Sequence, residues 1–228
     1  MPLLRFDAVG KRYAGGHEAL ADVSFKVEAG EMLFVTGHSG AGKSTLMRLI
    51  HLAEQPSRGV VLMEDRNLAR LRGRQVALQR RRVGVVFQDH RLLMDRSVFE
   101  NVAMPLLIAG VPRNEIAVRV RKGLEKVGLG NREQARPREL STGEQQRVGI
   151  ARAVVAQPPL LIADEPTGNL DPTLAEEIMD LFAALPAQGT TVLVASHDLG
   201  LVKRMRKRTL VLDHGRLLDD IPATELAA

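Results

Sequence analysis

The stretch Gly37-His38-Ser39-Gly40-Ala41-Gly42-Lys43-Ser44 matches the pattern G-x-x-x-x-G-K-[ST] of a phosphate-binding loop. It follows an apolar run at 32–35, which is typical of a strand buried on both faces, and it precedes a helical pattern. Glycines let the backbone N–H groups point inward at phosphate. Lys43 adds a positive charge there, and the Ser44 hydroxyl can bind Mg²⁺. We therefore expect a nucleotide site formed by Gly37, His38, Ser39, Gly40, Ala41, Gly42, Lys43, Ser44 and Thr45.

A pair of carboxylates ends the buried run at 160–163. Asp164 is placed to hold Mg²⁺, through water, at the end of a strand that neighbours the phosphate loop. Glu165 is placed to orient or deprotonate an attacking water. The two acids could instead cap the next element. A serine nucleophile is excluded, because the pattern G-x-S-x-G needs glycine where Ala41 stands.

Strands and helices alternate along the chain, which predicts an α/β fold with a mostly parallel sheet. Alternating apolar and polar residues near the N-terminus indicate half-buried strands. A long helical stretch in the middle indicates an inserted subdomain. Strands are expected at 3–9, 22–28, 32–35, 83–87, 160–163, 191–195, 209–212 and 216–218, and helices at 97–109, 114–127, 141–156, 172–185 and 198–205.

The composition is that of an ordinary globular protein. The 228 residues are 45% hydrophobic and 26% charged, with a net charge of +5. The absence of cysteine excludes disulfides and thiolate metal sites. No run reaches the ~18–20 apolar residues that span a bilayer, and no signal peptide is evident, which predicts a cytoplasmic protein. Aromatic residues make up only 3%, which disfavours binding of single-stranded nucleic acid.

Five further motifs resemble those of ABC ATPases. Leu140-Ser141-Thr142-Gly143-Glu144-Gln145-Gln146-Arg147 resembles the signature motif, and Gly168-Asn169-Leu170-Asp171 resembles the D-loop. Tyr13 stands where the adenine-stacking aromatic is expected. Gln88 matches the glutamine of the Q-loop, and His197 matches the switch histidine. The resemblance spans residues 3–219 and implies a single ABC ATPase domain over 1–228.

That resemblance implies a P-loop NTPase fold with a RecA-like core, an antiparallel β subdomain and an α-helical subdomain at 89–157, followed by a tail at 220–228. It implies ATP and Mg²⁺ as cofactors, with Mg²⁺ held by Ser44, Gln88 and Asp164. It also implies catalytic roles for Glu165, His197, Gln88 and Lys43. Two copies are expected to pair head to tail when ATP binds. Each ATP would then meet, from the other copy, Ser141, Thr142, Gly143, Glu144 and Asp171.

The signature motif departs from the commoner Leu-Ser-Gly-Gly-Gln at two positions. Thr142 replaces the first glycine, where a positive φ would disfavour a β-branched residue. Glu144 replaces glutamine and forms, with Ser141, the pattern S-x-x-E of a helix capping box. Glu144 could therefore stabilise the helix start rather than point at phosphate. We expect ATP turnover to survive both changes.

Residues 163–171 resemble a group that contains lipoprotein-release, macrolide-export and cell-division ATPases. Within it, residues 38–46 and 87–106 are most similar to the bacterial cell-division members. This resemblance implies an FtsX-like membrane partner that docks around 88–106, a link to FtsZ, and regulation of septal cell-wall hydrolysis from the cytoplasmic face of the inner membrane. The alternative is the ATPase subunit of a lipoprotein-release or macrolide-type exporter. A nucleic-acid ABC ATPase and a non-catalytic scaffold are the remaining alternatives.

Overall fold

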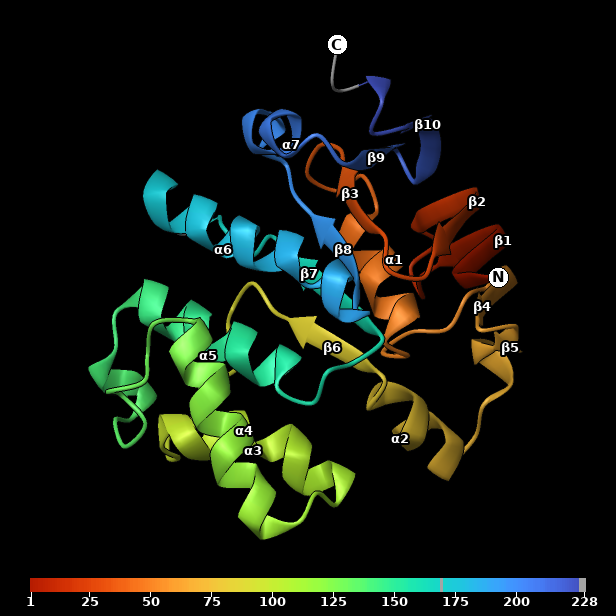
Figure 1. Ribbon diagram of the computed structural model, residues 1–228. Coiled ribbons are helices and arrows are strands. Elements are labelled where there is room, and N and C mark those ends of the chain that lie inside the picture. Colours follow the sequence, from red (N-terminus) through yellow and green to blue (C-terminus); the bar gives the residue numbers. More distant parts are fainter. Residues whose placement is uncertain (169, 226–228) are drawn as a thin grey trace.

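The centre of the protein is a six-stranded sheet with the order β10-β9-β3-β8-β7-β6. The computed structural model describes residues 1–168 and 170–225. Neighbouring strands from β6 to β9 are parallel, and only β10 runs antiparallel to its neighbour. The strands are β3 (Met32–Thr36), β6 (Val83–Val86), β7 (Leu160–Asp164), β8 (Thr191–Ala195), β9 (Arg208–Asp213) and β10 (Arg216–Ile221). This sheet, with α1 (Lys43–Ile50), α6 (Pro172–Ala184) and α7 (Leu199–Met205), forms the α/β core (Figure 1).

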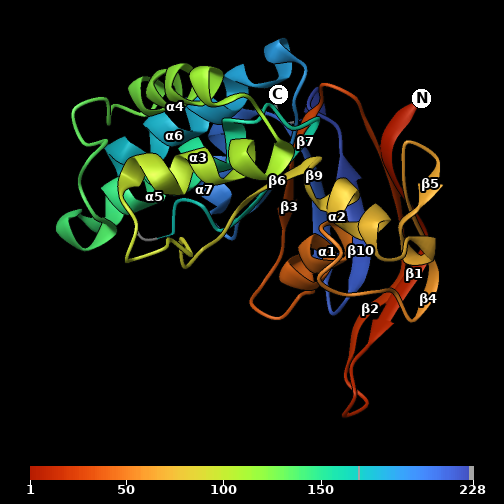
Figure 2. The ribbon, with the colours of Figure 1, turned by 90° about the horizontal axis from the view of Figure 1, so that it is seen from below.

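A second, antiparallel sheet has the order β2-β1-β4-β5 and lies at one side of the core (Figure 2). Its strands are β1 (Pro2–Arg12), β2 (Glu18–Glu28), β4 (Arg58–Met63) and β5 (Arg66–Asn67). Its inward-facing residues share one apolar cluster with β3 and α1, in which Phe6 stacks on Phe25 with ring centroids 4.6 Å apart. The antiparallel sheet therefore supports the strand and helix on either side of the phosphate loop.

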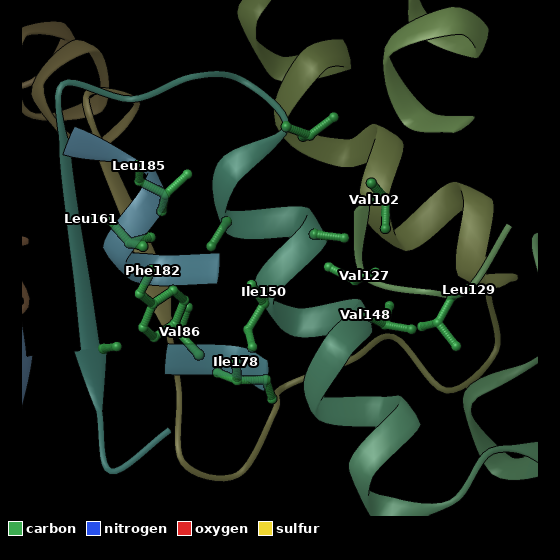
Figure 3. Close-up of a cluster of buried hydrophobic side chains, with 14 of the residues drawn as sticks. Val86, Val102, Val127, Leu129, Val148, Ile150, Leu161, Ile178, Phe182 and Leu185 are labelled. Carbon is green, nitrogen blue, oxygen red and sulfur yellow. The ribbon is translucent and has the colours of Figure 1, made fainter. Parts of the chain in front are cut away.

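Three helices form the inserted subdomain, namely α3 (Val98–Ala109), α4 (Arg113–Lys126) and α5 (Thr142–Val154). A capping box starts α3, since Ser97 accepts from the backbone of Glu100 and the Glu100 carboxylate accepts from the backbone of Ser97. The subdomain shares its apolar core with the parallel sheet. Figure 3 shows Val148 and Ile150 of α5 packed among side chains from α3, α6 and the sheet. Core sheet, antiparallel sheet and helical insertion thus confirm the predicted fold class.

Two segments differ from the predicted elements. The hairpin β4–β5 and the helix α2 (Arg74–Arg80) were not expected from the sequence. The hairpin turn consists of Glu64 and Asp65, which adopt positive φ angles of 48° and 58° without the usual glycine. At the other end of the chain, β10 continues to Ile221, so the tail begins later than predicted. Among the described residues, no helix is long and apolar enough to cross a bilayer.

Candidate nucleotide-binding site

The phosphate loop joins β3 to α1, as the sequence predicts. Gly37 has φ 148°, and a Cβ there would lie 2.1 Å from the carbonyl oxygen of Leu212, so only glycine fits at the start of the loop. The Lys43 Nζ donates to the carbonyl oxygens of Gly37 (2.7 Å) and His38 (3.2 Å). The ammonium group is therefore folded into the loop, at the place where phosphate oxygens can take over these bonds.

The loop lines a cleft of about 580 Å³. Tyr13 reaches this cleft from the turn between β1 and β2, and its hydroxyl lies 3.3 Å from the Thr45 Oγ1. The cleft brings together most of the predicted ATP-contacting residues, namely Tyr13, His38, Ser39, Gly40, Ala41, Gly42, Lys43, Ser44, Thr45, Gln88, Glu165 and His197. Its lining combines an aromatic ring, Tyr13, with a lysine-bearing loop, groups that can contact the base and the phosphates of a nucleotide.

Glu165 lies at the centre of a charged cluster in this cleft. Its carboxylate accepts from the His197 Nδ1 (2.6 Å), and its other oxygen lies 3.7 Å from the Lys43 Nζ. The Glu165 side chain is 14% exposed, whereas that of His197 is 67% exposed. The sheet explains the proximity of these residues, because Asp164 at the end of β7 pairs with Ala195 at the end of β8. A carboxylate held there can orient or deprotonate a water molecule.

Asp164 presents a carboxylate with an unsatisfied oxygen. Its Oδ1 is buried and has no hydrogen-bond partner among the described residues. Burial raises the pKa of the Asp164 carboxyl, and the Glu165 charge raises it further, while the Ser44 hydroxyl and the Lys43 ammonium act in the opposite direction. A cavity of about 480 Å³ is lined by Asp164, Ser44 and Gln88 together. Mg²⁺ prefers hard oxygen donors, and the oxygens of Ser44, Gln88 and Asp164 are of that type, so these residues fit a magnesium ion.

The signature and D-loop residues lie elsewhere on the chain. Among the described residues, Ser141, Thr142, Gly143, Glu144 and Asp171 do not line the cleft of the phosphate loop. Both views show α5 and α1 well apart, with β6 between them (Figures 1 and 2). Asp171 caps α6 by accepting from the Leu174 backbone N–H (3.1 Å). Asn169 of the D-loop lies outside the described residues. One chain therefore presents these two motifs away from its own phosphate loop.

The first turn of α5 has a conformation that accepts both departures from the common signature. Thr142 is the first residue of the helix and does not have a positive φ, so the concern about its β-branched side chain does not apply. The capping box is present, since the Ser141 backbone donates to the Glu144 carboxylate (2.9 Å) and the Glu144 backbone donates to the Ser141 Oγ (3.3 Å). In this structure, Glu144 stabilises the helix start.

Gln146, which the sequence analysis did not single out, joins two segments that border the site. Its side chain is 2% exposed, and its amide donates to the carbonyl oxygen of Pro166 (2.8 Å), directly after the Asp164–Glu165 pair. Its Oε1 contacts the His90 Nδ1 in the Q-loop. Arg152 of the same helix donates to the carbonyl oxygens of His90 (2.6 Å) and Arg91 (2.7 Å). The run of three polar residues at 144–146 gave no local signal that the third one points inward.

The cleft, the parallel sheet and the helical insertion together define an ABC-type nucleotide-binding domain. The ABC transporter family model matches residues 20–168. Two solved structures share the fold with a TM-score of 0.90. The cassette MJ0796, described as a dimer, is 32% identical and matches 96% of this chain and 98% of its own. CbiO1 from Clostridium perfringens is 30% identical and matches 99% of this chain and 90% of its own.

Curated relatives narrow the assignment. The cell division ATP-binding protein FtsE of Escherichia coli K12 is 52% identical over 94% of this chain and 97% of its own length. FtsE of Mycobacterium tuberculosis is 46% identical over 96% of this chain and 95% of its own. The chain belongs to the ABC transporter family and, within it, to the FtsE group of ATP-binding proteins. It binds nucleotide and hydrolyses ATP.

Proposed function

We propose that the protein is the ATP-hydrolysing subunit of a bacterial cell-division complex with an FtsX-like membrane protein. The observation that carries the proposal is the similarity to FtsE proteins over almost their whole length, 97% for the E. coli protein. In this role, ATP-driven closure of a dimer is transmitted through the membrane partner to septal cell-wall hydrolysis. The protein then lies on the cytoplasmic face of the membrane at the septum, where a link to FtsZ is accessible.

Each residue of the cleft has its own role in ATP binding or hydrolysis. Glu165 acts on the attacking water, because its carboxylate is held in place by His197 and Lys43. Lys43 moves from the loop carbonyls to the β- and γ-phosphates. Tyr13 stacks on the adenine, and His197 turns toward the γ-phosphate from its exposed position. Gln88 lies between the cleft and the adjoining cavity, where it can contact both the water and the metal.

Mg²⁺ is assigned to the cavity beside the phosphate loop. Ser44, Gln88 and Asp164 all line it, and the unsatisfied Oδ1 of Asp164 is the group that most requires a cation. When bound, the ion neutralises charge on the transferred phosphate. The raised pKa of Asp164 supports the assignment, since a nearby cation stabilises the ionised carboxylate.

A head-to-tail homodimer completes the nucleotide site. The signature and D-loop residues lie away from the phosphate loop of their own chain, so they can reach ATP only from a second copy. The first turn of α5 directs backbone N–H groups outward, where they can meet the γ-phosphate, and the Ser141 hydroxyl, which donates to the Glu144 carboxylate in this structure (3.0 Å), would turn from it to the phosphate. The dimeric arrangement of the MJ0796 cassette supports this pairing.

The membrane partner is assigned to a groove of about 430 Å³ between the core and the helical subdomain. Met104, Pro105 and Ile108 of α3 form one wall, and Phe87 beside Gln88 lies at its base. Arg80, the last residue of α2, and Arg81 after it also line the groove. The Ile108 side chain is 52% exposed, so apolar surface beside the groove is open to a partner. A short cytoplasmic helix of the partner, apolar on one face and acidic at one end, fits this groove.

The test is co-purification from membranes of the tagged Glu165→Gln protein in the presence of MgATP. Recovery of an FtsX-like protein is expected, because the variant retains bound ATP in the closed dimer. Ile108→Asp in the same background is expected to remove the partner. Val118→Asp, at an apolar residue of α4 that is 67% exposed and outside the groove, is the matched control. Recovery of lipoprotein-release or macrolide-export subunits instead would refute the division role and leave the ATPase assignment unchanged.

A further inference from the structure

A cluster of His38, Asp213 and His214 lies beside the nucleotide cleft. His38 belongs to the phosphate loop, and the other two residues lie at the end of β9 and in the turn before β10. One ligand atom from each residue lies within 4.8 Å of the others. The His38 Nε2 is 2.9 Å from the Asp213 Oδ1, and the His214 Nε2 is 3.8 Å from the same oxygen.

The hydrogen bond at the His38 Nδ1 indicates that a cation is needed between the His38 Nε2 and Asp213. The His38 Nδ1 lies 2.6 Å from the backbone carbonyl oxygen of Ser39, which can only accept, so Nδ1 carries the proton. In neutral histidine, the Nε2 lone pair then faces the Asp213 carboxylate at 2.9 Å, and two acceptors at that distance repel each other. A cation between them, either a metal ion or a proton on Nε2, removes the repulsion.

The spacing is within a small adjustment of a metal site. Zn²⁺ binds imidazole nitrogen and carboxylate oxygen at about 2.0–2.2 Å, in tetrahedral geometry. Two such ligand atoms lie roughly 3.3–3.6 Å apart, so the observed 2.9 Å between the His38 Nε2 and the Asp213 Oδ1 would widen by about 0.4–0.7 Å when the ion binds. The His214 side chain is 83% exposed and can turn toward the ion. The carbonyl that accepts from the His38 Nδ1 is the type of partner that orients a metal-binding histidine.

The backbone beneath the cluster is fixed, so the ligands do not need to be assembled from mobile segments. The Gly215 N–H donates to the Ala41 carbonyl oxygen (3.0 Å), and its own carbonyl oxygen accepts from the Ala21 N–H (2.8 Å). A Cβ at Gly215 would lie 2.8 Å from the Ala19 carbonyl oxygen, which shows how closely the turn packs on β2. The turn that carries Asp213 and His214 is therefore joined to the phosphate loop.

We propose that His38, Asp213 and His214 form a site for Zn²⁺ or a similar late transition-metal ion, distinct from the magnesium that accompanies ATP. Two imidazoles and one carboxylate are a donor set that Zn²⁺ prefers and that Mg²⁺, which selects oxygen, does not. Three protein ligands leave a fourth position for water. The bound ion links the phosphate loop to the β9–β10 turn and so connects metal supply to nucleotide binding.

The experiment measures Zn²⁺ binding by calorimetry on the metal-free, nucleotide-free chain, without a histidine tag and with excess Mg²⁺ present. One Zn²⁺ per chain is expected, and bound Co²⁺ is expected to give a visible spectrum of low-symmetry coordination. His214→Asn should weaken Zn²⁺ binding at least ~10-fold, as loss of even an outer partner does. Asparagine suits the positive φ of 43° at this position, so the turn is preserved. Asp213→Asn provides a second variant that removes a ligand.

His17→Asn, at an exposed histidine outside the cluster, is the control and should bind Zn²⁺ as the unmodified chain does. Equal Zn²⁺ affinity in the unmodified, His214→Asn and Asp213→Asn chains would overturn the proposal, because binding would then occur elsewhere. Absence of Zn²⁺ uptake at neutral pH would also overturn it. The gap would in that case hold a proton, as an ion pair between the His38 imidazolium and Asp213.

Discussion

At the scale of single residues, Glu165 shows the strain that functional sites often contain. Its φ is 50°, a left-handed conformation that costs a non-glycine residue about 1–2 kcal/mol. Its backbone N–H donates to the Ala195 carbonyl oxygen (3.0 Å), and the carboxylate is held by His197. Contacts from β8 and the following loop thus maintain a conformation that directs the side chain into the cleft.

The first prediction follows from that position. Glu165→Gln is expected to lower ATP turnover about 10²–10⁴-fold, because an amide cannot accept a proton from water. ATP binding should be retained, since the amide keeps the shape of the side chain. Phosphate release and binding of a fluorescent ATP analogue measure the two effects. Glu176→Gln, at the surface of α6, is the control and should leave both unchanged. ATP turnover within threefold of the unmodified protein would show that Glu165 has no catalytic role.

A second prediction concerns Asp164 in the metal-free protein. Burial raises its folded-state pKa, so the ionised carboxylate lowers the free energy of unfolding at neutral pH. The stability associated with this group is fully present below its unfolded pKa and is lost as pH rises through the folded pKa. Asp164→Asn should therefore melt higher than the unmodified chain at neutral pH with EDTA, and the difference should shrink as pH falls. A lower melting temperature for Asp164→Asn at neutral pH would contradict the view that the buried, ionised carboxylate destabilises the metal-free protein.

At the scale of elements, α5 connects three parts of the site. Its N-terminus carries the signature, its buried Gln146 bonds to Pro166 after β7, and Gln146 and Arg152 contact the Q-loop around His90. The burial of Arg152 lowers the pKa of its guanidinium, which nevertheless remains charged at neutral pH. A movement of α5 therefore displaces both the Q-loop and the segment that follows Glu165.

The third prediction tests that connection. Gln146→Leu should lower the free energy of unfolding by about 1–3 kcal/mol, because a buried carbonyl of Pro166 loses its donor. It should also lower ATP turnover per folded molecule while ATP affinity is retained. Gln145→Leu is the matched control, because Gln145 bonds only to carbonyls of the preceding loop, at Pro137 and Leu140. Equal turnover in the two variants would show that the Gln146 link does not influence the site.

The fourth prediction concerns the first turn of α5. Because Thr142 has helical geometry and no positive φ, Thr142→Gly should change ATP turnover less than tenfold and should weaken the helix by about 0.3 kcal/mol. Steady-state phosphate release and thermal melting measure the two quantities. A hundredfold or greater rise in turnover would show that threonine limits the unmodified protein.

Local pattern explains which elements could be predicted. The phosphate-loop motif and the apolar run before it locate β3 and α1, and an apolar run locates β7, because each signal lies in the element itself or directly beside it. The hairpin β4–β5 was missed because its turn uses Glu64 and Asp65 in place of glycine or asparagine. The helix α2 was missed because its run Arg74–Arg80 is short and largely exposed, without an apolar stripe.

At the scale of the whole molecule, some site residues could be predicted from local motifs, whereas others depend on tertiary packing. The residues of the cleft were predictable because parallel strands end at one edge of the sheet, which brings together motifs such as those at Asp164 and His197. The contact of Gln146 with His90 was not predictable, because it joins residues 56 positions apart through tertiary packing. The cluster of His38 with Asp213 likewise depends on how the β9–β10 turn packs on the phosphate loop.

The separation of the phosphate loop from the signature within one chain has a genetic consequence. In the proposed symmetric dimer, a Lys43→Ala chain and a Ser141→Arg chain are each inactive alone, but a mixed pair contains one site with both halves intact. Equal pools that pair at random should regain about one quarter of the intact sites. If one intact site is enough for function, two such alleles should complement each other in a cell, and neither should be dominant-negative, because a pair of one normal and one altered chain also keeps one intact site.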